Sequence, residues 1–77
     1  MESIRRPLKS LMKNINNVVQ VKLKNDLEYK GHMVQCDAYM NIIMDHATEY
    51  KSGEMSANYG YIFIRGNNIL YIVVPAS

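Results

Sequence analysis

The chain has 77 residues, of which 48% are hydrophobic, and its formal net charge is +2. A chain of this length forms one small domain, near the limit at which a single hydrophobic core is sufficient, and its hydrophobic content excludes a disordered protein. No apolar run is long enough to cross a bilayer and the N-terminus lacks a signal-peptide core, so we expect a soluble, cytoplasmic protein without a membrane partner.

The first predicted element is an amphipathic helix over about residues 3–15. Its apolar residues follow the i, i+3, i+4, i+7 spacing of a helix with one buried side: Leu8, Leu11, Met12 and Ile15. Pro7 suits the first turn, and Asn16–Asn17 ends the helix. We expect the helix to cap one end of a barrel, and backbone contacts of Arg5 or Arg6 with a nucleic acid stay open.

Five β-strands are predicted after the helix. In the first strand, alternation places Val19, Val21 and Leu23 on one buried face and polar residues on the other. In the third strand, Met40, Ile42 and Met44 share a face. The strands are expected at about residues 18–24, 28–36, 41–51, 59–65 and 69–74.

Turn residues and one glycine shape the predicted sheet. A tight turn at Asn25–Asp26 joins the first two strands. Gly31 lies inside the second strand, where a glycine permits the sharp bend that a five-stranded sheet needs to curl into a small barrel. Residues 51–58 are loop-like and are predicted to form a hairpin connection with little of its own to bury.

The last two predicted strands indicate an oligomer. Both alternating faces are apolar in Tyr61–Ile64 and in Ile69–Val74, and strands of this kind need cover on both faces. A short chain with one helix cannot supply that cover, so we expect the fourth strand of one copy to pair with the fifth strand of the next. Such a head-to-tail contact closes into a ring or grows into a fibre. A ring would repeat the modest charge of each chain around one axis.

Two stretches between predicted strands combine planar or charged groups with amides. Tyr39 and the Arg65 guanidinium offer flat surfaces on which a nucleobase could stack. The Asn41 amide offers a donor and an acceptor for the edge of an unpaired base, and Asp37 can accept hydrogen bonds from backbone N–H groups or from that amide. Local composition alone favours plain turns, so a pocket for one base is the alternative interpretation at this point.

Other chemistry has little support in the sequence. Asp45 and His46 are neighbours on a predicted strand and point to opposite faces, so they cannot converge with His32 unless a bulge intervenes. Surface histidines are the better interpretation, because the chain has no metal-binding spacing, phosphate loop or paired nucleophile and base. Cys36, the only cysteine, is expected to pack as a small hydrophobic residue. We therefore predict no enzyme, metal or cofactor.

The order of residues around these stretches resembles a known family. The segment from Gly31 to Met44, with its Asp-x-x-Met-Asn pattern, resembles the first signature motif of the Sm/LSm family, and Ile62–Ile69, with its Arg-Gly-Asn, resembles the second. The resemblance implies a mostly β fold: a short N-terminal helix followed by a strongly bent five-stranded antiparallel sheet that forms a small open barrel and assembles into rings. One Sm-like domain would span residues 1–77, with the motifs at about 18–50 and 59–75.

The resemblance also assigns roles and a ligand. In the family, the positions of Tyr39 and Arg65 stack on the two faces of a base, and the position of Asn41 recognises uracil. Asp37 and Asn67 would hold the Asn41 amide in place. The implied ligand is U-rich single-stranded RNA at the pore of the ring, with one base per subunit, and the implied roles are RNA processing or a scaffold together with other RNA-processing proteins.

The chain departs from the family pattern at three positions. Tyr39 stands where a histidine is common, which keeps stacking but removes the imidazole hydrogen bond. Asn67 stands where an aspartate is common, which removes a charge near Arg65. Gln35 stands where a glycine is often found, whereas Gly66 matches the family and would allow a close turn.

Three kinds of protein remain compatible with these features. A self-sufficient archaeal-type Sm protein, forming a homoheptamer through its fourth and fifth strands, fits best. An Hfq-type RNA chaperone is the alternative within the class, although the chain lacks the Lys-His pair of that second motif. A small-barrel adaptor, which binds protein strands along its edge and never contacts RNA, is the alternative from another class.

Overall fold

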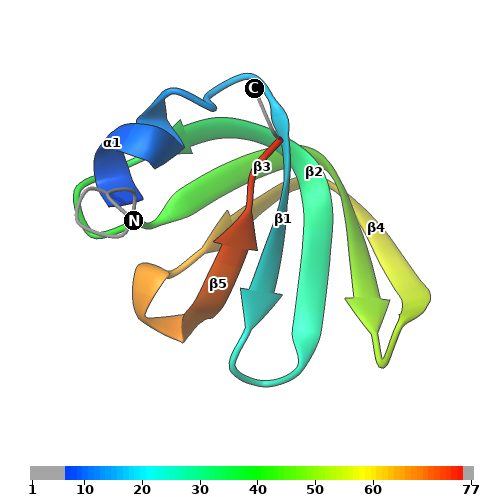
Figure 1. The fold of residues 1–77 in the computed structure, drawn as a ribbon. Helices are drawn as coiled ribbons and strands as arrows, with labels where there is room; N and C mark the ends of the chain where they lie inside the picture. The colour runs from blue at the N-terminus through cyan, green and yellow to red at the C-terminus, as the bar shows by residue number, and fades with distance from the viewer. Residues whose placement is uncertain (1–6, 76–77) are drawn as a thin grey trace.

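The computed structural model describes residues 7–75, which form one short helix packed on a single antiparallel sheet (Figure 1). The sheet has five strands in the order β4-β3-β2-β1-β5, so β4 and β5 lie at its two edges. This arrangement confirms the predicted fold class. The elements are α1 (Pro7–Met12), β1 (Val18–Leu23), β2 (Leu27–Cys36), β3 (Ile42–Lys51), β4 (Glu54–Ile64), the 3-10 turn η2 (Gly66–Asn68) and β5 (Ile69–Val73).

The helix is shorter than predicted. Residues 3–6 of the predicted helix lie outside the described part of the chain, and α1 ends at Met12 instead of Ile15. The N–H of Asn16 donates to the Met33 carbonyl on β2 at 2.7 Å, and Asn16 adopts a φ of 78°. This tie to the sheet and the left-handed backbone end the helical path. Ile15 still packs against the core from the turn that follows α1.

The hairpin connection predicted over residues 51–58 is present between β3 and β4, but it is much shorter than expected. The chain reverses in a tight turn in which Ser52 and Gly53 have φ values of 53° and 82°, and β4 begins directly afterwards at Glu54. Turns with two positive φ values match the twist of a β-hairpin. The small polar side chains that indicated a loop are exposed or half-buried residues of an edge strand, where they bond to β3: Asn58 accepts from Thr48 at 3.0 Å.

Gly31 lies inside β2, where the pairing with β3 is irregular. The register between β2 and β3 shifts at this point. A methyl group at Gly31 would lie 2.9 Å from Ala47 Cα and 3.0 Å from the Asp45 carbonyl oxygen. A side chain would therefore push β3 away from β2, and only glycine lets the two strands approach this closely.

The core lies inside the curved sheet and beneath α1 (Figure 1). It includes the three alternating residues of β1 that the sequence predicted, as well as Cys36, which is a buried free thiol. Burial raises the pKa of this thiol above its usual range. Within residues 7–75, no helix is long and apolar enough to span a membrane. The buried core residues are Leu11, Val19, Val21, Leu23, Tyr29, Met33, Cys36, Ile42, Met44, Ala47 and Ile64.

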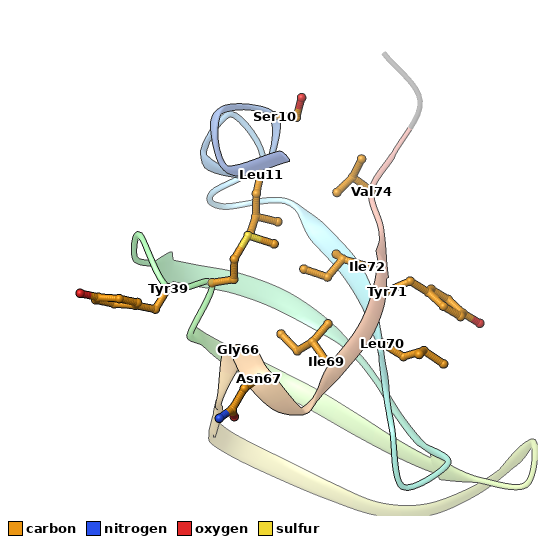
Figure 2. A pocket seen from close by; sticks show the side chains of 11 residues that line it. Ser10, Leu11, Tyr39, Gly66, Asn67, Ile69, Leu70, Tyr71, Ile72 and Val74 are labelled. Carbon is orange, nitrogen blue, oxygen red and sulfur yellow. The ribbon is translucent and has the colours of Figure 1, made fainter. Parts of the chain in front are cut away.

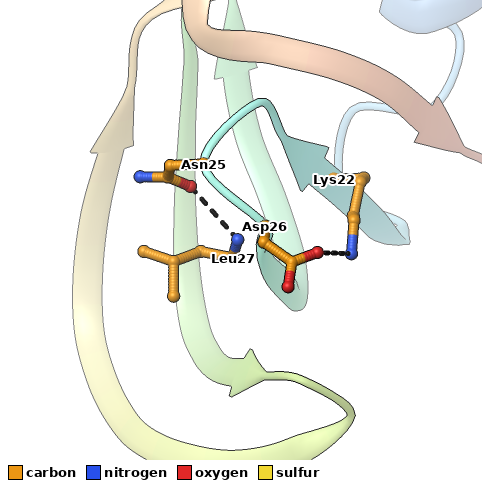
Figure 3. Close-up of polar contacts among 4 residues, drawn as sticks. All are labelled: Lys22, Asn25, Asp26 and Leu27. Carbon is orange, nitrogen blue, oxygen red and sulfur yellow. Dashed lines mark hydrogen bonds and ion pairs between the residues drawn. The ribbon is translucent and has the colours of Figure 1, made fainter.

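The turn between β1 and β2 forms at the predicted Asn25–Asp26 (Figure 3). The Asn25 side-chain oxygen accepts from the Leu27 N–H at 3.1 Å, and Asp26 adopts a φ of 75°. The Asp26 carboxylate also lies 3.0 Å from the Lys22 ammonium, and this hydrogen bond raises the pKa of Lys22. Asparagine and aspartate thus close the turn through their side chains.

Tyr29 is the one buried residue of the core cluster that carries a phenol group. Its hydroxyl donates to Glu49 at 2.6 Å. Burial, followed by this bond, raises the pKa of Tyr29, and the same bond is the main cause that lowers the pKa of Glu49. Ser56 and Tyr59 also donate to the Glu49 carboxylate, at 2.7 and 3.5 Å. The charged carboxylate therefore ties β2 to β3 and β4.

Replacing Tyr29 with phenylalanine is expected to lower the free energy of unfolding by about 1 kcal/mol at neutral pH, because a short hydrogen bond is lost. The pKa of Glu49 is lowered in the fold, so the charged Glu49 carboxylate adds to the free energy of unfolding above the ordinary glutamate pKa. This stabilisation is lost as the pH falls through the lowered pKa. Urea titrations at several pH values measure both effects. Tyr59→Phe, which removes only the 3.5 Å contact, is the control and should change stability less.

Candidate functional site

The two stretches singled out in the sequence meet at one end of the sheet. The loop after β2 contains Asp37 and leads into Asn41, and the η2 turn after β4 begins at Gly66. The backbone N–H of Gly66 donates to the Asn41 side-chain oxygen at 2.7 Å. A segment between β2 and β3 is thereby joined to one between β4 and β5.

Asp37 organises the first of these loops. One carboxylate oxygen accepts from the backbone N–H groups of Tyr39 at 2.9 Å and Asn41 at 3.0 Å, and the other accepts from the Asn41 side-chain amide at 3.1 Å. The bond from the Asn41 amide is the largest cause that lowers the pKa of Asp37, with the two backbone bonds adding to it. The loop therefore keeps its anionic acceptor at neutral pH.

The Asn41 amide is held in one orientation from both ends. Its oxygen accepts from Gly66 and its nitrogen donates to Asp37. An amide oxygen has two lone pairs and an amide nitrogen has two hydrogens, so one acceptor and one donor remain for a ligand. The surrounding bonds also decide which side of the amide donates and which accepts.

The contact between the two loops is so close that Gly66 cannot carry a side chain. A methyl group there would overlap the Tyr39 carbonyl oxygen and lie 3.0 Å from the carbonyl carbons of Tyr39 and Met40. Met40 adopts a φ of 65°, which is uncommon for a residue with a long side chain. Its N–H donates to the Asp37 carbonyl at 2.9 Å, and its side chain packs against the core.

Tyr39 and Arg65 lie on the exposed part of this region. The Tyr39 side chain points away from the body of the protein, and the residue is 81% exposed (Figure 2). Arg65 is exposed and directly precedes η2. No ion pair among residues 7–75 involves Arg65. A planar aromatic ring and a guanidinium group are therefore both accessible to a ligand.

One feature of the site was missed in the sequence. Asp37 holds Asn41 as expected, but the described hydrogen bonds include none between Asn67 and Asn41, and the second bond on the amide comes from the Gly66 backbone instead. Asn67 is exposed beside Gly66. A backbone N–H donor cannot be predicted from the type of residue that carries it. The only signal in the sequence was Gly66, because a glycine allows the two loops to approach.

The histidines converge on Asp45, contrary to expectation. The Asp45 carboxylate lies 3.1 Å from His32 Nδ1 and 3.3 Å from His46 Nδ1. The expectation failed because a bulge is present: His46 has a φ of 48° and the β2–β3 register shifts nearby. Within the described residues, no group of three or more potential ligands could hold a metal ion. Both rings are at the surface, since the side chains are 37% and 90% exposed.

A groove of about 570 Å³ borders the site (Figure 2). It runs between α1, the loop after β2 and the strand β5. We call it the β5 groove. It is lined by Ser10, Leu11, Tyr39, Met40, Gly66, Asn67, Ile69, Leu70, Tyr71, Ile72 and Val74.

Comparisons with known proteins identify the family of this chain. The family model of the LSM domain matches residues 9–74. The chain belongs to this family. A U6 snRNA-associated Sm-like protein LSm6 from Debaryomyces hansenii is 48% identical over 58 residues, which make up 75% of this chain and 68% of the relative. A second LSm6, from Pyricularia oryzae, is 42% identical over 86% of this chain and 80% of the relative.

Solved structures of Sm proteins resemble this LSM domain closely. The Pyrococcus abyssii Sm protein in complex with a uridine heptamer has a TM-score of 0.87 at 33% identity, over 91% of this chain and 99% of that chain. A heptameric archaeal Sm protein has a TM-score of 0.79 at 28% identity, over 88% and 98% of the two chains. The two curated relatives are eukaryotic, so they do not support the expectation of an archaeal-type protein.

Proposed function

We propose that this LSM domain binds U-rich single-stranded RNA as one subunit of a ring, with one base held by each subunit near the pore. The single observation that carries the proposal is the Asn41 amide, fixed between Asp37 and the Gly66 N–H with one donor and one acceptor left over. The protein would be a binding protein and not an enzyme, with a role in RNA processing or as an RNA–protein scaffold. Its cytoplasmic location stays a prediction.

The fixed amide favours uracil over cytosine. Uracil presents the O4 acceptor beside the N3–H donor, which complements the free N–H and the free lone pair of Asn41, whereas cytosine presents the opposite pattern. Tyr39 and Arg65 would stack on the two faces of the base. Because Asp37 and Gly66 already hold the Asn41 amide, this side chain would lose little conformational entropy when the base binds.

The free edges of the sheet support the ring. β4 and β5 have no neighbour on their outer sides in the described chain, and both expose large apolar residues: Tyr61, Phe63, Leu70 and Tyr71. Pairing of β4 with β5 of the next copy would cover both edges. We propose seven identical copies, by similarity to the heptameric archaeal Sm protein. Native mass spectrometry of the purified chain tests this assembly, and a monomer at micromolar concentration would contradict it.

Support for the ligand comes from the relatives. The Pyrococcus abyssii structure contains a uridine heptamer, and the two curated relatives are described as U6 snRNA-associated. Several bases bound by one ring would add their affinities by avidity, so that weak recognition of single bases becomes useful for a short tract.

Binding of labelled oligo(U) and oligo(C) at several salt concentrations tests the function. We expect a preference for oligo(U), and we expect Asn41→Ala to abolish this preference because it removes both groups that contact the base edge. Asn58→Ala, on β4 away from the site, is the matched control and should keep it. Electrostatic attraction to the phosphates is common to both ligands and falls with salt. Equal or absent binding of both by the native chain would favour the protein adaptor.

A further inference from the structure

The β5 groove shares its lining with the candidate base site. Tyr39 and Met40 from the loop after β2, and Gly66 and Asn67 from η2, form one part of the groove. The opposite part consists of α1 and β5. Figure 2 shows Leu11, Ile69 and Ile72 facing the space between these parts, whereas the Tyr39 ring points away from it. The same two loops therefore carry the candidate base site on one side and line the β5 groove on the other.

The two loops are joined by direct contacts. Gly66 touches the Tyr39 carbonyl and donates to Asn41, while Met40 is held by Asp37 and packs against the core. Packed groups move together because little free space separates them. A molecule that presses on Met40 or Gly66 from the groove would therefore shift or fix the Asn41 amide.

The occupant that fits the groove is β4 of a second copy. Among residues 7–75, β5 has no partner on its outer edge, borders the groove and exposes Leu70 (58%) and Tyr71 (50%). β4 is the other unpaired edge, and it exposes Tyr61 (68%) and Phe63 (60%). The two apolar edges do not pair with each other among the described residues, and they are complementary in a head-to-tail contact between copies.

We infer that docking of a neighbouring β4 against the β5 groove is energetically coupled to uridine binding at Asn41. The neighbour closes the open side of the groove and restricts both loops, so the base site is complete only in the assembled protein. Coupling between two sites is reciprocal, so uridine in turn strengthens the contact between subunits. This inference rests on the proposed function and adds a dependence of the base site on its neighbour.

Uridine monophosphate is the probe that separates coupling from avidity, because a single nucleotide occupies one site and gains nothing from linked sites. Phe63→Glu places a charge on the docking strand, and Phe63 does not line the variant's own groove. We expect a folded monomer by circular dichroism and native mass spectrometry. Its affinity for uridine monophosphate should fall by about 5- to 150-fold, the usual range for coupled sites.

The effect of uridine binding on the contact between subunits is measured with the native ring. Saturating uridine monophosphate should slow the dissociation of subunits after dilution, and cytidine monophosphate should not. Tyr61→Glu on the same strand replaces Phe63→Glu if that variant does not fold. A folded monomeric variant that binds uridine monophosphate as tightly as the native ring would overturn the coupling and leave the proposed function intact. A native ring that binds neither uridine monophosphate nor oligo(U), or a native chain that does not assemble, would overturn both.

Discussion

Replacing Ile42 with alanine is expected to lower the free energy of unfolding by about 2–5 kcal/mol. Ile42 is fully buried and pairs across the sheet with Ile64, which is also buried. These two residues stand immediately beside Asn41 and Arg65, so the core contact between them brings the two halves of the site together. The cavity left by the substitution would therefore weaken both the fold and the base site.

Thermal unfolding measures the effect. For a domain of this size, each kcal/mol corresponds to roughly 4–8 °C in Tm, so a fall of roughly 10 °C or more is expected, together with weaker oligo(U) binding at low temperature. Ile43→Ala is the matched control, because Ile43 is the next residue, points to the other face and is only half-buried. Equal losses for the two variants would show that the Ile42–Ile64 contact is not the anchor described here.

Replacing Gly66 with alanine is expected to cost about 1–3 kcal/mol of stability, as other substitutions that overfill a packed site do. The added methyl group overlaps the Tyr39 carbonyl oxygen, and this obstacle is backbone that cannot rotate away. The loops must separate, so the bond from the Gly66 N–H to Asn41 lengthens or breaks. Selectivity for oligo(U) over oligo(C) should therefore decrease even in molecules that remain folded.

Gly60→Ala serves as the control for this variant. A methyl group at Gly60 on β4 meets nothing within 4 Å, so its effect on the stability of the chain should be small. Urea unfolding of both variants, followed by titration with the two oligonucleotides, gives stability and selectivity in parallel. A Gly66→Ala protein with native stability and native selectivity would contradict the proposed role of the close contact.

The fold could be predicted wherever burial alternates along a strand. In β1 the period of two placed Val19, Val21 and Leu23 in the core, and the structure buries all three. The first half of β4 was assigned to a loop, because an edge strand with small polar residues has the composition of a turn. The end of α1 was also misplaced, since the bond from Asn16 to β2 depends on the tertiary structure.

The candidate site could be predicted only as far as its side chains define it. The bonds from Asp37 to the Asn41 amide followed from residue types at short spacing. The hydrogen bond from the Gly66 N–H to Asn41 and the bulge at His46 depend on the backbone, and residue types alone do not predict them. Positions with a strained or closely approached backbone are therefore where reasoning from sequence fails, and here the Gly66 contact coincides with the region that we propose binds the ligand.

In the described part of the chain, the two free edges of the sheet are unlike each other, since one belongs to the long strand β4 and the other to the short strand β5. A ring built from this contact contains subunits related by rotation alone, and none is inverted. Every base slot then faces the same way around the hole. RNA has distinct 5′ and 3′ ends, so a bound tract would run around the ring with a single polarity, clockwise or anticlockwise but never both.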